Sequence, residues 1–140
     1  MSRPPTAPLV PVGEGYVPGV CNIGAWEVRR RRAFALLAFG IAGIGLMLLF
    51  AIGAPPAVRV TLLLPVWGGM FSWLQARRRF CAAFAMGGIV NFGDGTAERR
   101  AVEDPAAHRE DLLAILRMTR DSFLLAVPVT APALLLTARF

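Results

Sequence analysis

The 140-residue sequence contains no lysine, so all fifteen of its basic residues are arginine. The chain therefore has no lysine-bearing glycine-rich loop of the kind that holds nucleotide phosphates. With only two cysteines, Cys21 and Cys81, it cannot be a disulfide scaffold. No serine is spaced with a histidine and an acid as in a hydrolytic triad. These absences remove the common catalytic classes, and we expect a protein that is not an enzyme.

Histidine is nearly absent as well. The single one, His108, lies in residues 94–111, which form the only hydrophilic stretch. No histidine falls within a long apolar run, so imidazole ligation of a haem or chlorin inside a bilayer is not expected. A metal site would need two ligands besides the cysteines, and only His108 offers a nitrogen donor. The sequence predicts no metal and no cofactor, and leaves open a bound lipid.

Apolar residues, by contrast, are abundant: they make up 56% of the chain, and the mean hydropathy is +0.56. Residues 33–53 carry no charge, and a helix of that length crosses about 30 Å of hydrocarbon. Residues 57–75 form a second apolar run. Pro55 and Pro56 lie between the two runs, where they end one helix and can begin the next. We therefore predict an all-α fold built on an integral membrane helical hairpin.

Arginine clusters flank the hairpin. Four arginines precede the first span and three follow the second: Arg29, Arg30, Arg31, Arg32, Arg77, Arg78 and Arg79. Only Arg59 lies near the other end, where its long side chain can reach the interface. The positive-inside rule then places the N-terminus and both ends of the hairpin in the cytoplasm. We predict a multi-pass protein of a bacterial inner membrane, with arginines that bind anionic lipids and not nucleic acid.

Small residues fall on one face of the first span, at Ala38, Ala42 and Gly45. This spacing lets another helix approach closely, and the second span is the obvious neighbour. Neither span contains aspartate or glutamate, so an ion or proton path through this chain alone is not expected. The sequence thus favours helix packing over transport.

Two further segments border the hairpin. Residues 1–20 contain many prolines and glycines and predict an extended arm, which is either a disordered tail or a strap lying on a partner. Residues 80–92 are apolar but too few to span, so we predict a short segment at the cytoplasmic interface or packed under the hairpin. Residues 21–92 then form the hairpin unit.

The last third, residues 93–140, begins with a hydrophilic turn. Asp104 followed by Pro105 predicts the start of an amphipathic helix, with the aspartate as N-cap. Residues 122–138 are uncharged and interrupted by two prolines. We predict a third membrane helix here; the alternative is a re-entrant or interfacial segment docked on a partner.

The two cysteines are the candidate site of chemistry. Cys21 lies just before the first span and Cys81 just after the second, so a hairpin returns both to the same membrane face. As a functional pair they could form a redox dithiol, a persulfide carrier or half of a soft-metal site, and nearby arginines would favour the reactive thiolate. Alternatively they are two buried, small apolar residues in a reducing compartment.

A sequence pattern around the cysteines resembles a known family. It comprises Asn22-Ile23-Gly24, Glu27, Arg29-Arg30, the apolar hairpin, Phe80-Cys81, Phe84 and Gly88-Ile89. This resembles, over residues 21–89, the small two-helix membrane domains associated with rhodanese sulfurtransferases. Those domains open with Asn-x-Gly and close with Phe-Cys-Pro-Leu-Tyr before Gly-Ile; here Ala82 stands in place of the proline. The resemblance implies a two-helix membrane domain with an embedded cysteine.

The small size, the small-residue face and the apolar arm leave surfaces that a lone hairpin does not bury. We therefore predict a non-catalytic accessory or structural subunit of a larger membrane complex, such as a respiratory or photosynthetic electron-transfer assembly. The alternative is a thiol- or sulfur-handling membrane protein that uses Cys21 and Cys81.

Overall fold

The computed structural model describes residues 15–94 and 99–136. Its helices are α1 (Ala25–Ala51), α2 (Pro56–Arg59), the 3₁₀ turn η1 (Val60–Leu62), α3 (Leu63–Arg78), α4 (Ala82–Met86) and α5 (Pro105–Leu135). The strands β1 (Ile89–Asn91) and β2 (Arg99–Ala101) pair antiparallel, with Val90 opposite Arg100. The described chain is mostly helical, in agreement with the predicted all-α class, and it adds this small sheet.

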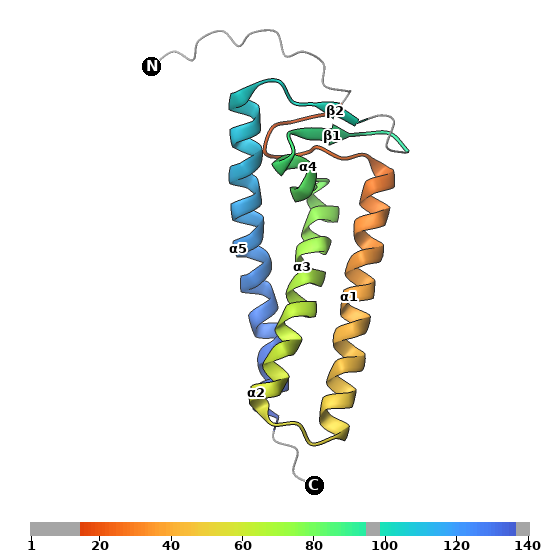
Figure 1. The fold of residues 1–140 in the computed structure, drawn as a ribbon, viewed down its shortest axis with the longest axis vertical. Helices are drawn as coiled ribbons and strands as arrows, with labels where there is room; N and C mark the ends of the chain where they lie inside the picture. The colour runs from red at the N-terminus through yellow and green to blue at the C-terminus, as the bar shows by residue number, and fades with distance from the viewer. Residues whose placement is uncertain (1–14, 95–98, 137–140) are drawn as a thin grey trace.

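Three long helical segments, which we call rods, lie side by side: α1, the continuous run of α2, η1 and α3, and α5. Helix α3 lies between α1 and α5 (Figure 1). One end carries α4, β1, β2 and the arginine clusters, and we call it the arginine-rich end. The connection between α1 and α2 lies at the opposite end, which we call the turn end. Helix α5 runs from the arginine-rich end back to the turn end. Each of the three rods therefore extends over nearly the full height of the bundle (Figure 1).

The turn end forms where the sequence predicts it. Gly53 adopts φ +64°, a left-handed conformation that glycine enters without penalty, and Pro55 is extended. Pro56 then occupies the first position of α2, where its missing N–H is not needed. The predicted span 33–53 is helical as far as Ala51, where α1 ends, and α1 begins earlier, at Ala25.

Residues 80–92 form the short helix α4 and the strand β1, with Ala82, Ala85 and Val90 buried. This segment packs onto the end of the bundle, which is the second of the two placements considered from the sequence; the strand was not predicted. Pairing of β1 with β2 also crosses the predicted boundary between residues 92 and 93. A three-residue strand at Ile89 carries too short an alternation to be read from sequence alone.

Helix α5 joins two segments that the sequence analysis treated separately. Asp104 caps it as predicted, accepting a hydrogen bond from the Ala106 amide at 3.0 Å, and Pro105 follows at the first position. The helix then continues to Leu135 with Pro128 and Pro132 inside it. The predicted third span is therefore the second half of one long helix as far as the described residues extend.

The bundle buries small side chains and exposes large ones. One stripe of α5, spaced at three and four residues, faces inward. It consists of Ala107, Asp111, Ala114, Met118, Ser122, Ala126, Thr130 and Ala133. On the outer face, Leu124 is 62% exposed and Leu135 is 79% exposed. The sequence of this helix also predicts an apolar stripe of Leu112, Leu113, Ile115, Leu116 and Phe123. In the structure four of these residues are exposed, and Ile115 is half-buried.

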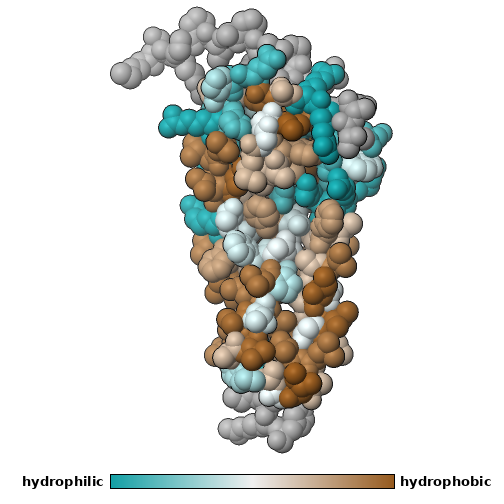
Figure 2. All heavy atoms as spheres, viewed as in Figure 1, coloured by the Kyte–Doolittle hydropathy of each residue, from teal (hydrophilic) through white to brown (hydrophobic). Residues whose placement is uncertain are grey.

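Helix α1 has the same inverted pattern, with Ala35 and Ala42 buried and Met47 74% exposed. Figure 2 shows hydrophilic side chains gathered at the arginine-rich end and apolar ones over the rest of the visible face. Within the described residues, α1 and the run Pro56–Arg78 are long and apolar enough to cross a membrane. In water such exposed leucines would be unfavourable, whereas lipid tails solvate them.

Helix α3 ends in a Schellman turn at Arg79. The Arg79 amide donates to the Ala76 carbonyl and the Phe80 amide to the Gln75 carbonyl, the paired bonds of that motif. Arg79 itself adopts φ +50°, and it is the one described non-glycine residue with a positive φ. Its side chain is exposed. The turn therefore holds an arginine in a conformation that favours glycine.

We expect Arg79→Gly to raise the free energy of unfolding by about 1 kcal/mol, because glycine removes the left-handed strain at no loss of contacts. Thermal unfolding of the full chain in detergent micelles measures this. The matched control is Arg77→Gly, inside the last turn of α3, which should destabilise by about 1 kcal/mol. Equal effects of the two substitutions would contradict the assignment of strain to Arg79.

Candidate functional site

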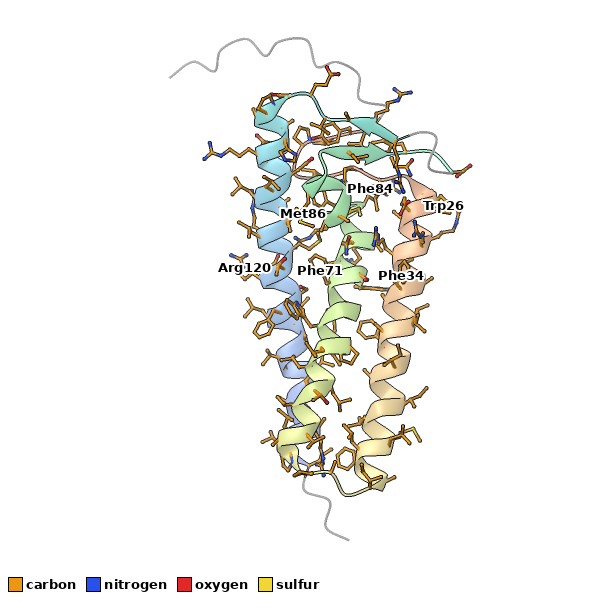
Figure 3. The ribbon with its side chains drawn as sticks, viewed as in Figure 1. Trp26, Phe34, Phe71, Phe84, Met86 and Arg120 are labelled. Atoms are coloured by element: carbon orange, nitrogen blue, oxygen red, sulfur yellow. The ribbon has the colours of Figure 1, made fainter. Side chains whose placement is uncertain are left out.

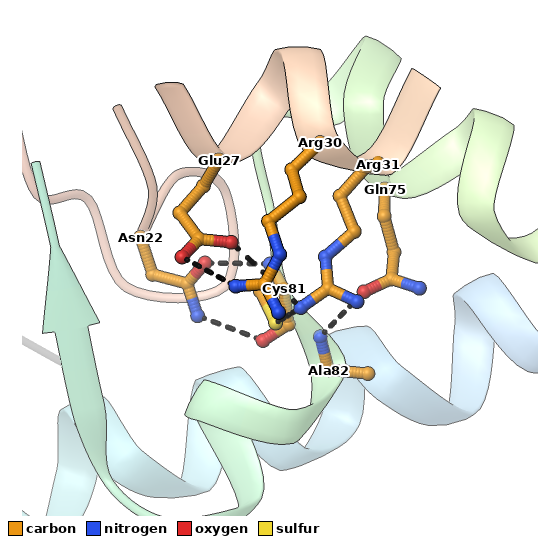
Figure 4. Close-up of polar contacts among 7 residues, drawn as sticks. All are labelled: Asn22, Glu27, Arg30, Arg31, Gln75, Cys81 and Ala82. Atoms are coloured by element: carbon orange, nitrogen blue, oxygen red, sulfur yellow. Dashed lines mark hydrogen bonds and ion pairs between the residues drawn. The ribbon is translucent and has the colours of Figure 1, made fainter. Parts of the chain in front are cut away.

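Asn22 joins the chain before α1 to the chain after α3. Its Nδ2 donates to the Cys81 carbonyl at 3.0 Å, and its Oδ1 accepts from the Cys81 amide at 2.6 Å (Figure 4). Asn22 and Cys81 are both fully buried. Gln75 adds a parallel bond, accepting from the Ala82 amide at 3.1 Å. The Asn22 and Gln75 oxygens thereby satisfy the Cys81 and Ala82 amides, while the Cys81 carbonyl also accepts from the Ala85 amide at 3.0 Å.

Beside these bonds of Asn22 and Gln75, a buried carboxylate lies between two arginines. Glu27 is 1% exposed, and its Oε1 accepts from Arg30 at 3.4 Å. Arg31 Nη2 lies 4.0 Å from Glu27 Oε2 and donates to Cys81 Sγ at 2.8 Å. Figure 4 shows both guanidinium groups descending from α1 toward Cys81. The Cys81 sulfur is thus shielded from solvent and held by one charged donor.

The topology brings the two predicted cysteines to the same end of the bundle. Cys21 directly precedes Asn22, whose side chain is bonded to Cys81, and both thiols are free. Cys21 is half-buried, and its sulfur makes one weak contact, to the Ile23 carbonyl at 3.9 Å. Cys81 belongs to the apolar cluster of Ile23, Val28 and Ala76. Its environment therefore combines an apolar floor with the Arg31 guanidinium.

The predicted arginines divide into two groups. Arg29, Arg30, Arg32, Arg77, Arg78 and Arg79 are exposed at the arginine-rich end, whereas Arg31 is half-buried by its contact with Cys81. Arg78 forms an ion pair with Asp121 of α5 at 2.7 Å. The cluster Arg77–Arg79 therefore carries exposed positive charge, and its member Arg78 also fixes α3 against α5.

The predicted packing face of α1 lies against the second rod. Ala42 is buried with Val66 and Ala126, and Ala38 is half-buried. A Cβ added at Gly45 would lie 3.1 Å from Leu62 Cδ2. Trp67 on α3 donates to Ser122 Oγ at 3.0 Å and so connects α3 to α5. This arrangement gives each pair of neighbouring rods a contact through small residues or one polar bond.

Asp111 is a functional candidate that the sequence analysis missed. It is fully buried on α5, where it accepts from the Tyr16 hydroxyl at 2.9 Å and from the Gly19 amide at 2.7 Å. The described part of the predicted arm, residues 15–20, is thereby held on α5 of the same chain. Burial raises the pKa of the Asp111 carboxyl, against the opposing effect of these two hydrogen bonds.

This raised pKa predicts a pH dependence. The folded chain binds the Asp111 proton more tightly than the unfolded chain, whose pKa is near 3.8. The resulting stability is complete below that value and is lost as pH rises through the folded pKa. We expect Asp111→Asn to remove this part of the decline in stability above about pH 4. Thermal unfolding of both proteins at a series of pH values from about 4 upward measures it, and parallel curves would contradict it.

Arg59, expected to extend to the interface, is instead 3% exposed at the turn end. Its Nη1 donates to the Leu136 carbonyl at 2.6 Å and approaches the Ala133 carbonyl at 3.5 Å. Its guanidinium also lies 4.2 Å from the ring centroid of Phe50. Arg59 therefore fastens the end of α5 to α1 and α2. The sequence does not show where α5 ends, so it could not predict the Leu136 carbonyl as the partner of Arg59.

Metal-ligating side chains do not gather in the described part of the chain, where no group of three or more His, Cys, Asp or Glu could hold an ion. His108 is half-buried, and its Nδ1 is buried without a hydrogen-bond partner. No family model, curated protein sequence or solved structure matches the chain. Function must therefore be argued from the geometry.

Proposed function

We propose that the chain is an integral membrane protein with three spans and a cytoplasmic arginine-rich end, and that it serves as a non-catalytic subunit of a larger membrane complex. As the class of complex we propose an electron-transfer assembly, respiratory or photosynthetic. The observation that carries the proposal is the inverted packing, with small residues inside and large apolar side chains outside along α1 and α5.

Two features support the third span. The outer face of α5 beyond Asp121 bears Leu124, Leu125 and Val127, all exposed, and carries no charge to Leu135. Arg59 also binds the end of α5 at the turn end, so α5 extends as far as the hairpin does. If the hairpin crosses the bilayer, α5 crosses with it, and the C-terminus lies outside the cytoplasm.

A subunit role is supported by the free face of α1. Only 11% of the most apolar stretch of α1 is buried. Gly40 and Gly43 lie on α1, and outside the backbone of α1 no atom of the described residues lies within 4 Å of a Cβ added at either position. Glycines at such positions weaken an isolated helix by about 1 kcal/mol each, and they permit close approach of another helix. A partner helix at this face would account for both.

The test is purification of the full chain from native membranes in mild detergent. We expect it to migrate with partner proteins, and the double substitution Gly40→Leu with Gly43→Leu to release it while its own unfolding temperature stays the same or rises. Gly68→Leu on α3, equally open in the chain, is the matched control. A wild-type chain that migrates only as a free monomer would overturn the subunit proposal.

One contact supports a second candidate function, a thiol- or sulfur-handling protein that uses Cys21 and Cys81. Arg31 Nη2 donates a hydrogen bond to Cys81 Sγ at 2.8 Å, so a guanidinium group lies directly beside this thiol. Cys81 is nevertheless fully buried, as a structural cysteine would be. Replacing each cysteine by serine separates the two functions: full retention of complex assembly and of any thiol reactivity in both variants eliminates the second.

A further inference from the structure

Residues 15–20, which lie on α5, form what we call the strap. A small hollow opens on the side of the bundle between this strap, the end of α3 and α5. Its volume is about 50 Å³. Phe80, Ala114 and Met118, all buried, form its apolar floor, and Val20 of the strap lies at its rim. Arg78 from α3 and Arg117 from α5 line it as well. The hollow thus combines an apolar floor with two guanidinium groups from different helices.

The charges around the hollow do not balance. Asp121 accepts from Arg78 at 2.7 Å and from Arg120 at 2.9 Å, and these bonds lower its pKa, so it stays ionised. Arg117 has no hydrogen bond or ion pair with any residue that the structure describes. Arg78 and Arg120 therefore share one carboxylate, and Arg117 has none among the described residues. An anion bound here would gain charge-assisted hydrogen bonds that the chain itself does not supply.

The position of the hollow indicates the source of that anion. In Figure 3, Arg120 lies at the level of Phe34 and Phe71, where the charged end of the bundle gives way to the apolar rods. The charge-free run of α5 begins at Ser122, one residue beyond Asp121. In the membrane orientation proposed above, on which this inference rests, that level corresponds to the headgroups of the cytoplasmic leaflet.

We propose that Arg78 and Arg117 bind the phosphate of an anionic phospholipid. A hollow of this size holds about three or four water-sized groups, which suits a phosphate and not a whole headgroup. The acyl chains then leave along the exposed apolar face of α5, over Leu124 and Leu125. A free phosphate ion has no acyl chains to cover Leu124 and Leu125, and the choline group of phosphatidylcholine would be repelled by the arginines.

The test uses the purified full chain in a neutral detergent, titrated separately with phosphatidylglycerol, phosphatidylcholine and sodium phosphate while its unfolding temperature is followed. We expect phosphatidylglycerol alone to stabilise the wild type. Arg117→Gln should raise the half-saturating phosphatidylglycerol concentration by about five- to tenfold, since one arginine contact with anionic lipid is lost. The variant is suitable because Arg117 is exposed and unpaired among the described residues, so its loss does not disturb folding.

The matched control is Arg32→Gln, an exposed arginine on α1 that does not line the hollow. Its titration should follow the wild type. Equal losses in the two variants, or equal stabilisation by phosphatidylcholine or by sodium phosphate, would overturn the lipid site. Membrane insertion is measured separately by alkaline carbonate extraction: a chain that is released into solution refutes the membrane proposal, whereas an inserted chain that ignores phosphatidylglycerol refutes only this inference.

Discussion

Replacing Arg59 by methionine is expected to lower the free energy of unfolding by about 3 kcal/mol. The last carbonyls of α5 have no partner within the helix, and the Arg59 guanidinium bonds to the Leu136 carbonyl at 2.6 Å. A positive charge there also offsets the negative end of the helix dipole and lies over the Phe50 ring. Methionine fills similar volume but supplies none of these interactions.

Equilibrium unfolding of the full chain in micelles measures this loss. Arg59→Lys keeps the charge but not the forked guanidinium, so it should fall between the wild type and the methionine variant. Arg77→Met, at an exposed arginine, is the control and should change stability by less than about 0.5 kcal/mol. A methionine variant as stable as the control would show that α5 is not fastened at the turn end.

The largest effect is expected at Asn22. The substitution Asn22→Leu is nearly isosteric, but it leaves the Cys81 amide buried without its partner and removes one of the two bonds that the Cys81 carbonyl accepts, the other coming from the Ala85 amide at 3.0 Å. At about 1–3 kcal/mol for the unsatisfied amide and about 1 kcal/mol for the lost bond to the carbonyl, we expect a loss of up to about 4 kcal/mol, enough to reduce the yield of folded protein. Unfolding in micelles measures the loss, and the yield of monodisperse protein in size-exclusion chromatography provides a second readout.

Gln75→Leu is the matched comparison for Asn22. Gln75 is buried as well, but among the described residues it makes one bond of the same kind, to the Ala82 amide. Its loss should be about half that of Asn22→Leu. If the two substitutions cost the same, the paired bonds to Cys81 are not what holds the two chain segments together.

The local features of the fold could be predicted from sequence because each depends on neighbouring residues. Pro55 and Pro56 interrupt a long apolar run, and a reversal of the chain follows from their backbone chemistry. Asp104 and Pro105 likewise predict a helix start, and the structure confirms the N-cap bond. Clustered arginines at both ends of the hairpin indicated that the two ends lie together, as they do in the bundle (Figure 1).

The contacts that organise the candidate site could not be predicted in this way. Asn22 and Cys81 are 59 residues apart, and nothing near either one indicates a bond between side chain and backbone. They are nevertheless two of the residues on which the resemblance to rhodanese-associated domains rests, which is the one signal that paired them. Asp111 resembles any solvated acid in a charged helix, and only the folded strap of residues 15–20 shows its burial.

The faces of α5 were misread for a physical reason. Apolar periodicity normally marks the buried face of a helix, because water drives large side chains inward. Leu113 and Leu116 are exposed here, and Ala114 and Met118 are buried between the rods. Where lipid is the solvent, close helix packing selects small residues for the inside, so the same pattern identifies the outer face.

Accessibility labelling tests the central claim, that the bundle crosses the membrane with its arginine-rich end in the cytoplasm. Single cysteines are placed at the exposed positions Ile52 and Asp94 and at the C-terminal residue Phe140, with Cys21 and Cys81 changed to serine. In intact spheroplasts a membrane-impermeant maleimide should label Ile52→Cys and Phe140→Cys, and should label Asp94→Cys only after permeabilisation. Labelling of Asp94→Cys in intact spheroplasts, or equal labelling of all three before permeabilisation, would contradict it.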